Sequence, residues 1–459
     1  MKLILMLLLY SFVPGAICLL LPRKNSIYVK LLAVAASLVC LVLSGVVFLM
    51  PLSNYQLFGL ELFRIDNLSR FIALFTGIFG FLVTLYSMKY FPAGSKLNMY
   101  FACLLFSLGS SFGAVLANHL VILLVFWGFL GLTLYLLIQS AGGDSGKAAK
   151  KTFIIVGGSD CLMVLAIAVI YLLTGTFQLD KIQLSTGGSG LATVAFLCLA
   201  AAAFAKAGAM PFHTWIPEMA KVSPAPVIAF LPASLDKLLG IYLLARISLN
   251  LFVLNPMLSN LMMLIGVITI IAAVFMAMVQ HDLKKLLSYH AVSQVGYMVL
   301  GIGTGNPVGI AGGLFHMLNH AIYKSCLFLC GGSIEQKTGT TDLDKLGGLA
   351  GRGGMPITFL AFTAASMAIS GVPPFNGFVS KWMIYQGLIE KISVGGTLTV
   401  VLFLVAAMFG SALTLASFMK LIHAIFFSRS ERSARSEQGA KNKGEVSWQM
   451  WLPQAALAL

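Results

Sequence analysis

Long apolar runs alternate with short polar breaks along the whole chain. The runs are centred on residues 3–21, 28–50, 67–88, 98–117, 119–138, 152–174, 192–220, 225–249, 256–279, 284–303, 308–331, 356–389 and 396–427. A helix of about twenty residues crosses about 30 Å of hydrocarbon, and lipid excludes open sheet edges. The pattern therefore predicts an all-α polytopic membrane protein with about 13–14 transmembrane helices.

Two of the predicted helices, the seventh and the twelfth, contain residues that break helices. Pro211 interrupts the seventh, and Pro373 and Pro374 interrupt the twelfth. Proline lacks a backbone donor, so these positions free backbone groups inside the membrane. Residues 201–212 and 364–375, which contain the breaks, match at six of twelve positions with an offset of 163. The offset covers five helices, and an odd number inverts the second copy, so we predict two inverted five-helix repeats.

The repeat divides the chain into four predicted parts. Residues 1–97 hold the first three helices, 98–250 the first five-helix repeat and 251–427 the second. Residues 428–459 hold a basic segment and the start of a final apolar helix of about twelve residues, which is too short to span a bilayer.

Composition supports a membrane protein and argues against nucleic acid as a partner. Charged residues make up 10% of the chain, against about 25% in soluble domains. The net charge of +15 comes from basic residues scattered through short loops, nineteen in the loops after odd-numbered spans and five on the other side. This bias predicts an outside N-terminus and cytoplasmic loops at 139–151, 332–355 and 428–446, in a multi-pass protein of the cell or inner membrane.

Ionisable residues inside the predicted spans are few and costly. Six are basic and two acidic: Arg70, Lys206, Lys237, Lys324, Lys381, Lys420, Asp160 and Asp236. Each charge costs about 2.5–3.5 kcal/mol at the bilayer centre. A single lysine near a helix end is more often a snorkelling anchor than a carrier. Gathered around two broken helices in an inverted repeat, however, these residues predict a buried ion path.

A polar stripe marks the eleventh predicted span. His316, His320 and Lys324 recur every four residues and share one helix face over about 12 Å. With the buried lysines and aspartates they predict a proton relay. The two histidines have the spacing of metal ligands, but no third ligand is adjacent. The histidines that stand singly are predicted to pack or to face the membrane surface: His119, His290 and His423.

The seven cysteines predict no cofactor. They lie inside apolar runs, and none has the C-x-x-C spacing of iron–sulfur or zinc ligands. Buried free thiols ordinarily act as small apolar packing residues. We therefore predict neither a metal nor a redox cofactor in this chain.

Six segments together resemble one membrane-protein family. They are F-R-I-D-N-L-S-R at 63–70, Y-S-M-K-Y at 86–90, F-A-K-A-G-A-M-P-F-H-T-W-I-P-E at 204–218, Y-H-A-V-S-Q-V-G-Y-M at 289–298, F-H-M-L-N-H-A-I-Y-K-S-C-L-F-L at 315–329 and P-P-F-N-G-F-V-S-K at 373–381. From about residue 60 to 425 the chain resembles the antiporter-like subunits of respiratory complex I, of membrane-bound hydrogenases of the formate hydrogenlyase type and of multisubunit Na+/H+ antiporters.

The resemblance implies roles for the buried residues. Lys206 would serve one half-channel and Lys381 the exit side. His316, His320 and Lys324 would form the central relay.

The chain departs from the family pattern in its fifth and eighth spans. Trp127 is followed by Gly128, where the family places a glutamate that pairs with the seventh-span lysine. The eighth span has Pro232 where relatives often have histidine, and adds Asp236 beside Lys237. Because a carboxylate is missing, we expect a substitute near Lys206, and Asp160, which matches an acidic family position in the sixth span, and Asp236 are the candidates.

The combined interpretation is a proton-translocating, antiporter-like subunit of a redox-driven complex of the complex I or hydrogenase type. Other membrane subunits would be its partners, and redox chemistry would occur in them. One alternative is a subunit of a multisubunit Na+/H+ antiporter without redox coupling. Another is a structural membrane subunit that no longer pumps. Replacing buried lysines would leave pumping intact only in the last case.

Overall fold

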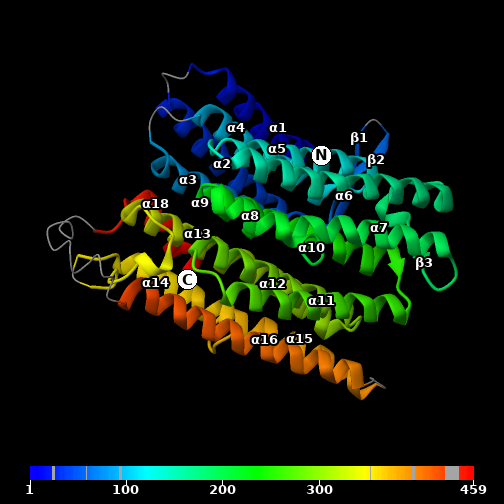
Figure 1. Cartoon of the computed structure of the whole chain (residues 1–459). Coiled ribbons are helices and arrows are strands. Elements are labelled where there is room, and N and C mark those ends of the chain that lie inside the picture. Colours follow the sequence, from blue (N-terminus) through cyan, green and yellow to red (C-terminus); the bar gives the residue numbers. More distant parts are fainter. Residues whose placement is uncertain (23–25, 58, 93–95, 352, 395–397, 429–443) are drawn as a thin grey trace. The chain divides into compact units, whose positions relative to one another are not determined.

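The computed structural model describes residues 1–459 except 23–25, 58, 93–95, 352, 395–397 and 429–443 (Figure 1). The described chain divides into two compact units. Unit 1 comprises Met1–Ala207 and Leu238–Asn255, and unit 2 comprises Gly208–Lys237 and Pro256–Leu459. The division assigns the two halves of the broken seventh helix to different units. It follows packing rather than sequence repetition, so the predicted domains at 1–97, 98–250, 251–427 and 428–459 stay a prediction.

Unit 1 is built from long helices and two small sheets. Its helices are α1 (Lys2–Leu20), α2 (Ser26–Leu49), α3 (Asn67–Tyr90), α4 (Leu97–Leu116), α5 (Leu120–Gln139), α6 (Ser145–Thr174), α7 (Gly190–Ala207) and most of α10 (Asp236–Arg246). An antiparallel hairpin joins β1 (Ser53–Leu57) to β2 (Leu60–Ile65), and a short parallel pair joins β3 (Leu184–Ser185) to β4 (Phe252–Val253). Helices α4, α5, α6 and α7 pack in sequence order, which places α5 and α7 on either side of α6.

Unit 2 is organised around one helix. Its helices are α8 (Trp215–Val222), α9 (Ala225–Phe230), α11 (Pro256–Met278), α12 (Leu283–Gly303), α13 (Pro307–Thr338), α14 (Pro356–Ser370), α15 (Asn376–Ser393), α16 (Leu398–Ile422) and α18 (Trp448–Ala458). Helix α13, which carries the predicted histidine and lysine stripe, packs against α9, α12, α14, α15 and α18. This position buries the stripe on every side.

The chain is an all-α polytopic membrane protein, as predicted. Each of the thirteen predicted spans is helical, and ten of the described helical segments are long and apolar enough to cross a membrane. The other three predicted spans correspond to α12, α13 and the pair α14–α15. Large apolar side chains such as Leu172, Met257 and Leu402 are exposed, as a surface in contact with lipid requires.

Both predicted helix breaks are confirmed. Helix α7 ends at Ala207 and α14 at Ser370, and each is followed by a glycine in the left-handed region, Gly208 with φ 77° and Gly371 with φ 78°. The two glycines correspond under the offset of 163, so the repeat extends to the backbone of the breaks. The peptide bonds Met210–Pro211 and Pro373–Pro374 are cis.

A third irregularity was not predicted. The eighth predicted span is divided by a π-helical turn at Leu231–Leu235, between α9 and α10. Pro232 lies in this turn, where its missing N–H removes a helical hydrogen bond. Asp236 and Lys237 follow the turn directly and are both fully buried.

The C-terminal helix is fixed against unit 2 by polar contacts. Gln454 of α18 donates to Ser333 Oγ at 2.5 Å, and the carboxylate of Glu445 accepts from the backbone N–H groups of Ile357 and Thr358 at 2.9 and 3.0 Å. Glu445 therefore caps α14 at its first turn. Most of the predicted basic segment, 429–443, lies outside the described residues.

Candidate functional site

Lys206 lies at the end of α7 and is completely buried within unit 1. Its Nζ donates to the carbonyl oxygen of Trp127 at 3.4 Å and lies 5.0 Å from the centre of the Trp127 ring. Trp127 belongs to α5, so the lysine reaches back towards the helix that, in the family pattern, carries its partner. The indole face supplies part of the stabilisation that a buried ammonium group needs.

Asp160 supplies the carboxylate expected near Lys206. It projects from α6, its charge interacts with that of Lys206, and its Oδ2 lies 3.7 Å from the Cβ position of Gly131 on α5. The sequence indicated Asp160 and Asp236 as candidates, and within unit 1 Asp160 fills this place. Gly128 is half-buried, and a Cβ added there would meet no described atom within 4 Å. There is therefore space for a side chain at position 128, where the family pattern has glutamate.

Lys324 is the central charge of unit 2. It is fully buried in α13, and its Nζ donates to the carbonyl oxygen of Leu287 on α12 at 2.8 Å. The ammonium group lies 5.3 Å from the ring centre of Phe418 on α16 and 5.9 Å from that of Phe328. Two aromatic faces and one carbonyl thus take the place of water around this lysine.

The two histidines of the predicted stripe have different surroundings. His316 is held on both sides, with Nδ1 2.9 Å from Ser380 Oγ and Nε2 3.1 Å from Gln294 Oε1. His320 is also completely buried, but neither ring nitrogen has a hydrogen-bond partner in the described part of the chain. A buried imidazole without a protein partner for either nitrogen is energetically costly.

Lys237 lies between the first helix break and the stripe. Its Nζ lies 3.0 Å from the position that a Cβ would occupy on Gly208, directly after α7. Its charge acts on His320 and on Lys324, and Asp236 acts in turn on Lys237. Unit 2 therefore brings together all five of these predicted site residues: Asp236, Lys237, His316, His320 and Lys324.

Lys381 occupies the second helix break. Its Nζ donates to the carbonyl oxygen of Ile369 at 2.8 Å and lies 4.9 Å from the centre of the Tyr297 ring. Ile369 is the residue of the second repeat that corresponds to Lys206. The break at Gly371 gives Lys381 room, because a Cβ there would lie 3.1 Å from the lysine Cδ. The helix-breaking residues Pro211, Pro373 and Pro374 follow Gly208 and Gly371 within three residues along the chain.

His290, which the sequence interpretation assigned to packing or to the membrane surface, lies beside the predicted site residues. It is fully buried in α12, its Nε2 lies 2.7 Å from Ser417 Oγ, and it interacts electrostatically with both Lys324 and Lys381. The available signal was helical spacing, since His290, Gln294 and Tyr297 lie at i, i+4 and i+7 on one face of α12.

A hydroxyl chain leads outward from Lys381. Tyr297 lies under the ammonium group, and its hydroxyl is 3.2 Å from Ser411 Oγ. Ser411 Oγ is in turn 2.9 Å from the hydroxyl of Tyr385, and both of these residues are half-buried. Tyrosine and serine hydroxyls donate and accept, so this chain can pass a proton between α12, α16 and α15.

Two ion pairs at helix ends were also missed, because their basic members were counted as loop residues. Lys284 is buried at the start of α12 and donates to both carboxylate oxygens of Glu335, at 3.0 and 3.1 Å. Arg246, at the end of α10, lies 2.6 Å from Asp66 Oδ2. Burial alone would raise the pKa of the Asp66 carboxyl, but the hydrogen bond and charge of Arg246 hold that pKa below its ordinary value.

The described residues were also compared with the requirements of a metal-binding site. No group of three or more His, Cys, Asp or Glu side chains with suitable geometry occurs among the described residues. His316 and His320 share a helix face but differ in their partners, and His316 already has both nitrogens in hydrogen-bond distance of side chains. The arrangement suits proton transfer between buried basic groups rather than coordination.

A family model described as the membrane part of NADH:quinone oxidoreductase and Mrp antiporter proteins matches residues 117–414. The chain belongs to this family. The match contains most of the site, from Trp127 to Ser411. The chain is therefore an antiporter-like membrane subunit of the Mrp and complex I group.

Two curated relatives are named as subunits of cation/proton antiporters. A Na+/H+ antiporter subunit of Alkalihalophilus pseudofirmus is 33% identical over 384 residues, which is 78% of this chain and 47% of the relative. A probable K+/H+ antiporter subunit of Rhizobium meliloti is 32% identical over 375 residues, 78% of this chain and 36% of the relative. The chain spans about half the length of the first relative and less of the second.

Solved structures share the fold. A chain of the Mrp complex from Dietzia sp. superimposes with a TM-score of 0.86 at 27% identity, covering 99% of this chain and 49% of the other. A chain of an archaeal membrane-bound sulfane sulfur reductase gives a TM-score of 0.83 at 24% identity, covering 98% and 74%. The second likeness concerns the fold alone.

Proposed function

We propose that this chain is a proton-conducting membrane subunit of a multisubunit cation/proton antiporter. Each unit has its own buried proton-binding groups. In unit 1, Lys206 and Asp160 hold a proton, and in unit 2 protons move through Lys237, His320, Lys324 and His290 towards Lys381.

The observation that carries the proposal is the continuity of basic groups in unit 2. Lys237 acts on His320 and Lys324, and His290 interacts with both Lys324 and Lys381. Holding several like charges at once in this interior would be costly, so a proton on one site disfavours a proton on the next. Movement of one proton along the line therefore displaces the others, which is how a buried relay transmits charge.

His320 and His316 would act differently in this relay. The unpartnered ring of His320 can turn to accept a proton from either neighbouring lysine. His316, fixed between Ser380 and Gln294, would set the position of the second broken helix while its ring faces the charge of Lys381. We assign proton transfer to His320 and positioning of the second broken helix to His316.

The outlet is the hydroxyl chain of Tyr297, Ser411 and Tyr385. Lys381 would leave the carbonyl of Ile369 to deliver its proton to Tyr297, and the half-buried Tyr385 would release it beyond α15. A lysine side chain has the rotational freedom for this movement.

The assembly would contain other membrane subunits and exchange protons for Na+ or K+ across the cell or inner membrane, with the N-terminus outside. Support comes from the names of the relatives, which are antiporter subunits, and from the nineteen-to-five distribution of basic loop residues. The sequence interpretation favoured a redox-driven complex, and membership of a family that includes NADH:quinone oxidoreductase subunits supports that alternative. Identifying the subunits that copurify with the chain distinguishes the two functions. A redox-driven complex would contain iron–sulfur or quinone-reducing subunits, whereas a cation/proton antiporter would contain small antiporter subunits.

Proton uptake by sealed inverted vesicles tests the proposal. Lys324→Met should abolish uptake, because it removes the central carrier without adding a buried charge. Lys420→Met is the matched control, since Lys420 lies in α16 but is exposed. Both variants must assemble to the same level. Uptake by Lys324→Met at the level of the control would contradict the relay and support a structural role.

The topology has a separate test. Single cysteines at Lys147 and Lys337 should be labelled by an impermeant maleimide from the cytoplasmic face, and a cysteine at Lys181 from the outside. The opposite pattern would reverse the proposed orientation without affecting the relay.

A further inference from the structure

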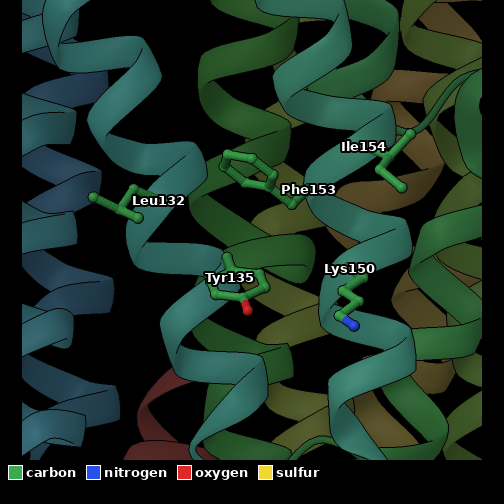
Figure 2. Close-up of a pocket in the computed structure, with 5 residues that line it drawn as sticks. All are labelled: Leu132, Tyr135, Lys150, Phe153 and Ile154. Atoms are coloured by element: carbon green, nitrogen blue, oxygen red, sulfur yellow. The ribbon is translucent and has the colours of Figure 1, made fainter.

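A groove on the surface of unit 1 is lined by none of the buried lysines. It is a cavity of about 300 Å³ between α5 and α6, lined by Leu132, Tyr135, Lys150, Phe153 and Ile154. Figure 2 shows the Tyr135 hydroxyl and the Lys150 ammonium group at one end, with the three apolar side chains towards the other. The proposed path uses none of these residues.

Polar and apolar groups follow each other along the groove in the same order as in a phospholipid molecule. Tyr135 lies four residues before α5 ends at Gln139, and Lys150 lies five residues after α6 begins at Ser145. Both polar groups are therefore near the membrane surface, while Leu132 and Ile154 lie deeper. A phospholipid has the same order, with a headgroup at the surface and acyl chains below it.

Aromatic and branched apolar side chains form the walls of the groove, and they are accessible from the surface of the chain. The rings of Tyr135 and Phe153 meet edge to face with centres 5.6 Å apart, and Ile154 is 71% exposed. Lys147 and Lys150 are also exposed, which gives this end of α6 a positive surface. A basic surface at the membrane boundary attracts anionic headgroups.

We propose that this groove binds one anionic phospholipid. The phosphate of the headgroup accepts hydrogen bonds from Lys150 and Tyr135, and an acyl chain lies along Leu132, Phe153 and Ile154. A helix of a partner subunit fits less well, because membrane helices approach closely over small residues, whereas the groove is lined by large ones. Lipid binding here goes beyond the proposed transport function and does not depend on it.

Native mass spectrometry of the full chain, and of its complex, tests the proposal with phosphatidylglycerol and phosphatidylcholine as probes. Wild-type protein should retain one phosphatidylglycerol in preference to phosphatidylcholine. Lys150→Gln should weaken retention about fivefold, the contribution of one lysine near a membrane surface. Lys147→Gln is the matched control, with the same charge change one turn away and outside the groove. Tyr135→Phe should weaken retention less, without unfolding the chain.

Three outcomes would overturn the proposal. Equal losses in Lys150→Gln and Lys147→Gln would indicate general surface attraction rather than a site. Equal retention of the two lipids would remove the role of the anionic headgroup. Retention by the isolated chain but not by the assembled complex would show that a partner subunit covers the groove.

Discussion

Asp160 of α6 and Lys206 of α7 interact electrostatically inside unit 1, and both side chains reach α5, the helix that carries Trp127 and Gly128. In the family pattern a glutamate on that helix pairs with the lysine, and here a glycine stands in its place. The carboxylate of α5 is therefore absent, and Asp160 of α6 is the acidic residue whose charge acts on the lysine at the end of α7. A buried ammonium group keeps a countercharge in both arrangements.

The first prediction concerns the countercharge of Lys206. Asp160→Asn should lower proton uptake about tenfold or more, since losing about 1.4 kcal/mol of attraction changes proton occupancy tenfold. Gly128→Glu added to that variant should recover part of the loss, because the position has open space for a side chain. Uptake is measured in inverted vesicles at matched assembly. No recovery, or full activity of Asp160→Asn, would show that Lys206 does not need this carboxylate.

The pair of Asp66 and Arg246 predicts how stability depends on pH. The pKa of Asp66 is lower in the folded protein than its ordinary value of about 3.9. Its stabilising contribution is therefore fully present above about pH 4 and is lost as pH falls through the depressed folded value. The thermal midpoint of the purified chain should decrease on acidification through this range.

Asp66→Asn should lower that midpoint at neutral pH and flatten its decrease below about pH 4. Asp144→Asn is a suitable control, because Asp144 also precedes a helix but its exposed side chain makes no capping hydrogen bond. The idea fails if the two variants have the same pH profile.

Lys284 and Glu335 should stabilise the junction of α8, α12 and α13. Lys284 also donates to the carbonyl of Ser223, the residue directly after α8. Glu335→Gln leaves a buried ammonium group without its countercharge, so we expect the free energy of unfolding to fall by about 2 kcal/mol, below the range for fully buried pairs because Glu335 is partly exposed. Glu390→Gln, an exposed carboxylate of α15, should change it little.

The double variant Lys284→Met with Glu335→Leu distinguishes an unpaired charge from lost packing. It removes both charges and should recover much of the stability measured by tryptophan fluorescence during thermal unfolding. If the double variant is as unstable as Glu335→Gln, the charge explanation is wrong.

Hydrophobic periodicity was sufficient to predict the helical fold, the thirteen helical segments and both glycine-proline breaks. Each of these follows from local chemistry: the length of an apolar run, or a residue that cannot continue a helix. The burial of Lys206, Lys237, Lys324 and Lys381 was predictable for a similar reason, since a charge in a long apolar run must be sheltered.

The partners of these residues were harder to predict, because they depend on helix packing. Lys420 was counted among the ionisable residues inside the spans but is exposed, while Lys284 was counted with the loops and is buried. His290 has Ser417 as its partner because α12 turns it towards α16. The π-helical turn at Leu231–Leu235 likewise required knowledge of how Pro232 is accommodated. Sequence spacing predicts which residues share a face of a helix, but only the folded structure shows which other helix packs against that face.

The last prediction concerns the outlet beyond Lys381. If protons leave through Tyr297, Ser411 and Tyr385, then Tyr385→Phe and Ser411→Ala should each slow uptake, because each removes one hydroxyl from the chain and little volume. We expect reductions of about tenfold, and no further reduction when the two are combined, since one gap already interrupts the chain. Tyr289→Phe is the matched control: Tyr289 is half-buried in the same unit, on α12, but lies outside this chain. If Lys381→Met abolishes uptake while Tyr385→Phe and Ser411→Ala behave like Tyr289→Phe, the relay stands and the proton leaves Lys381 by another route.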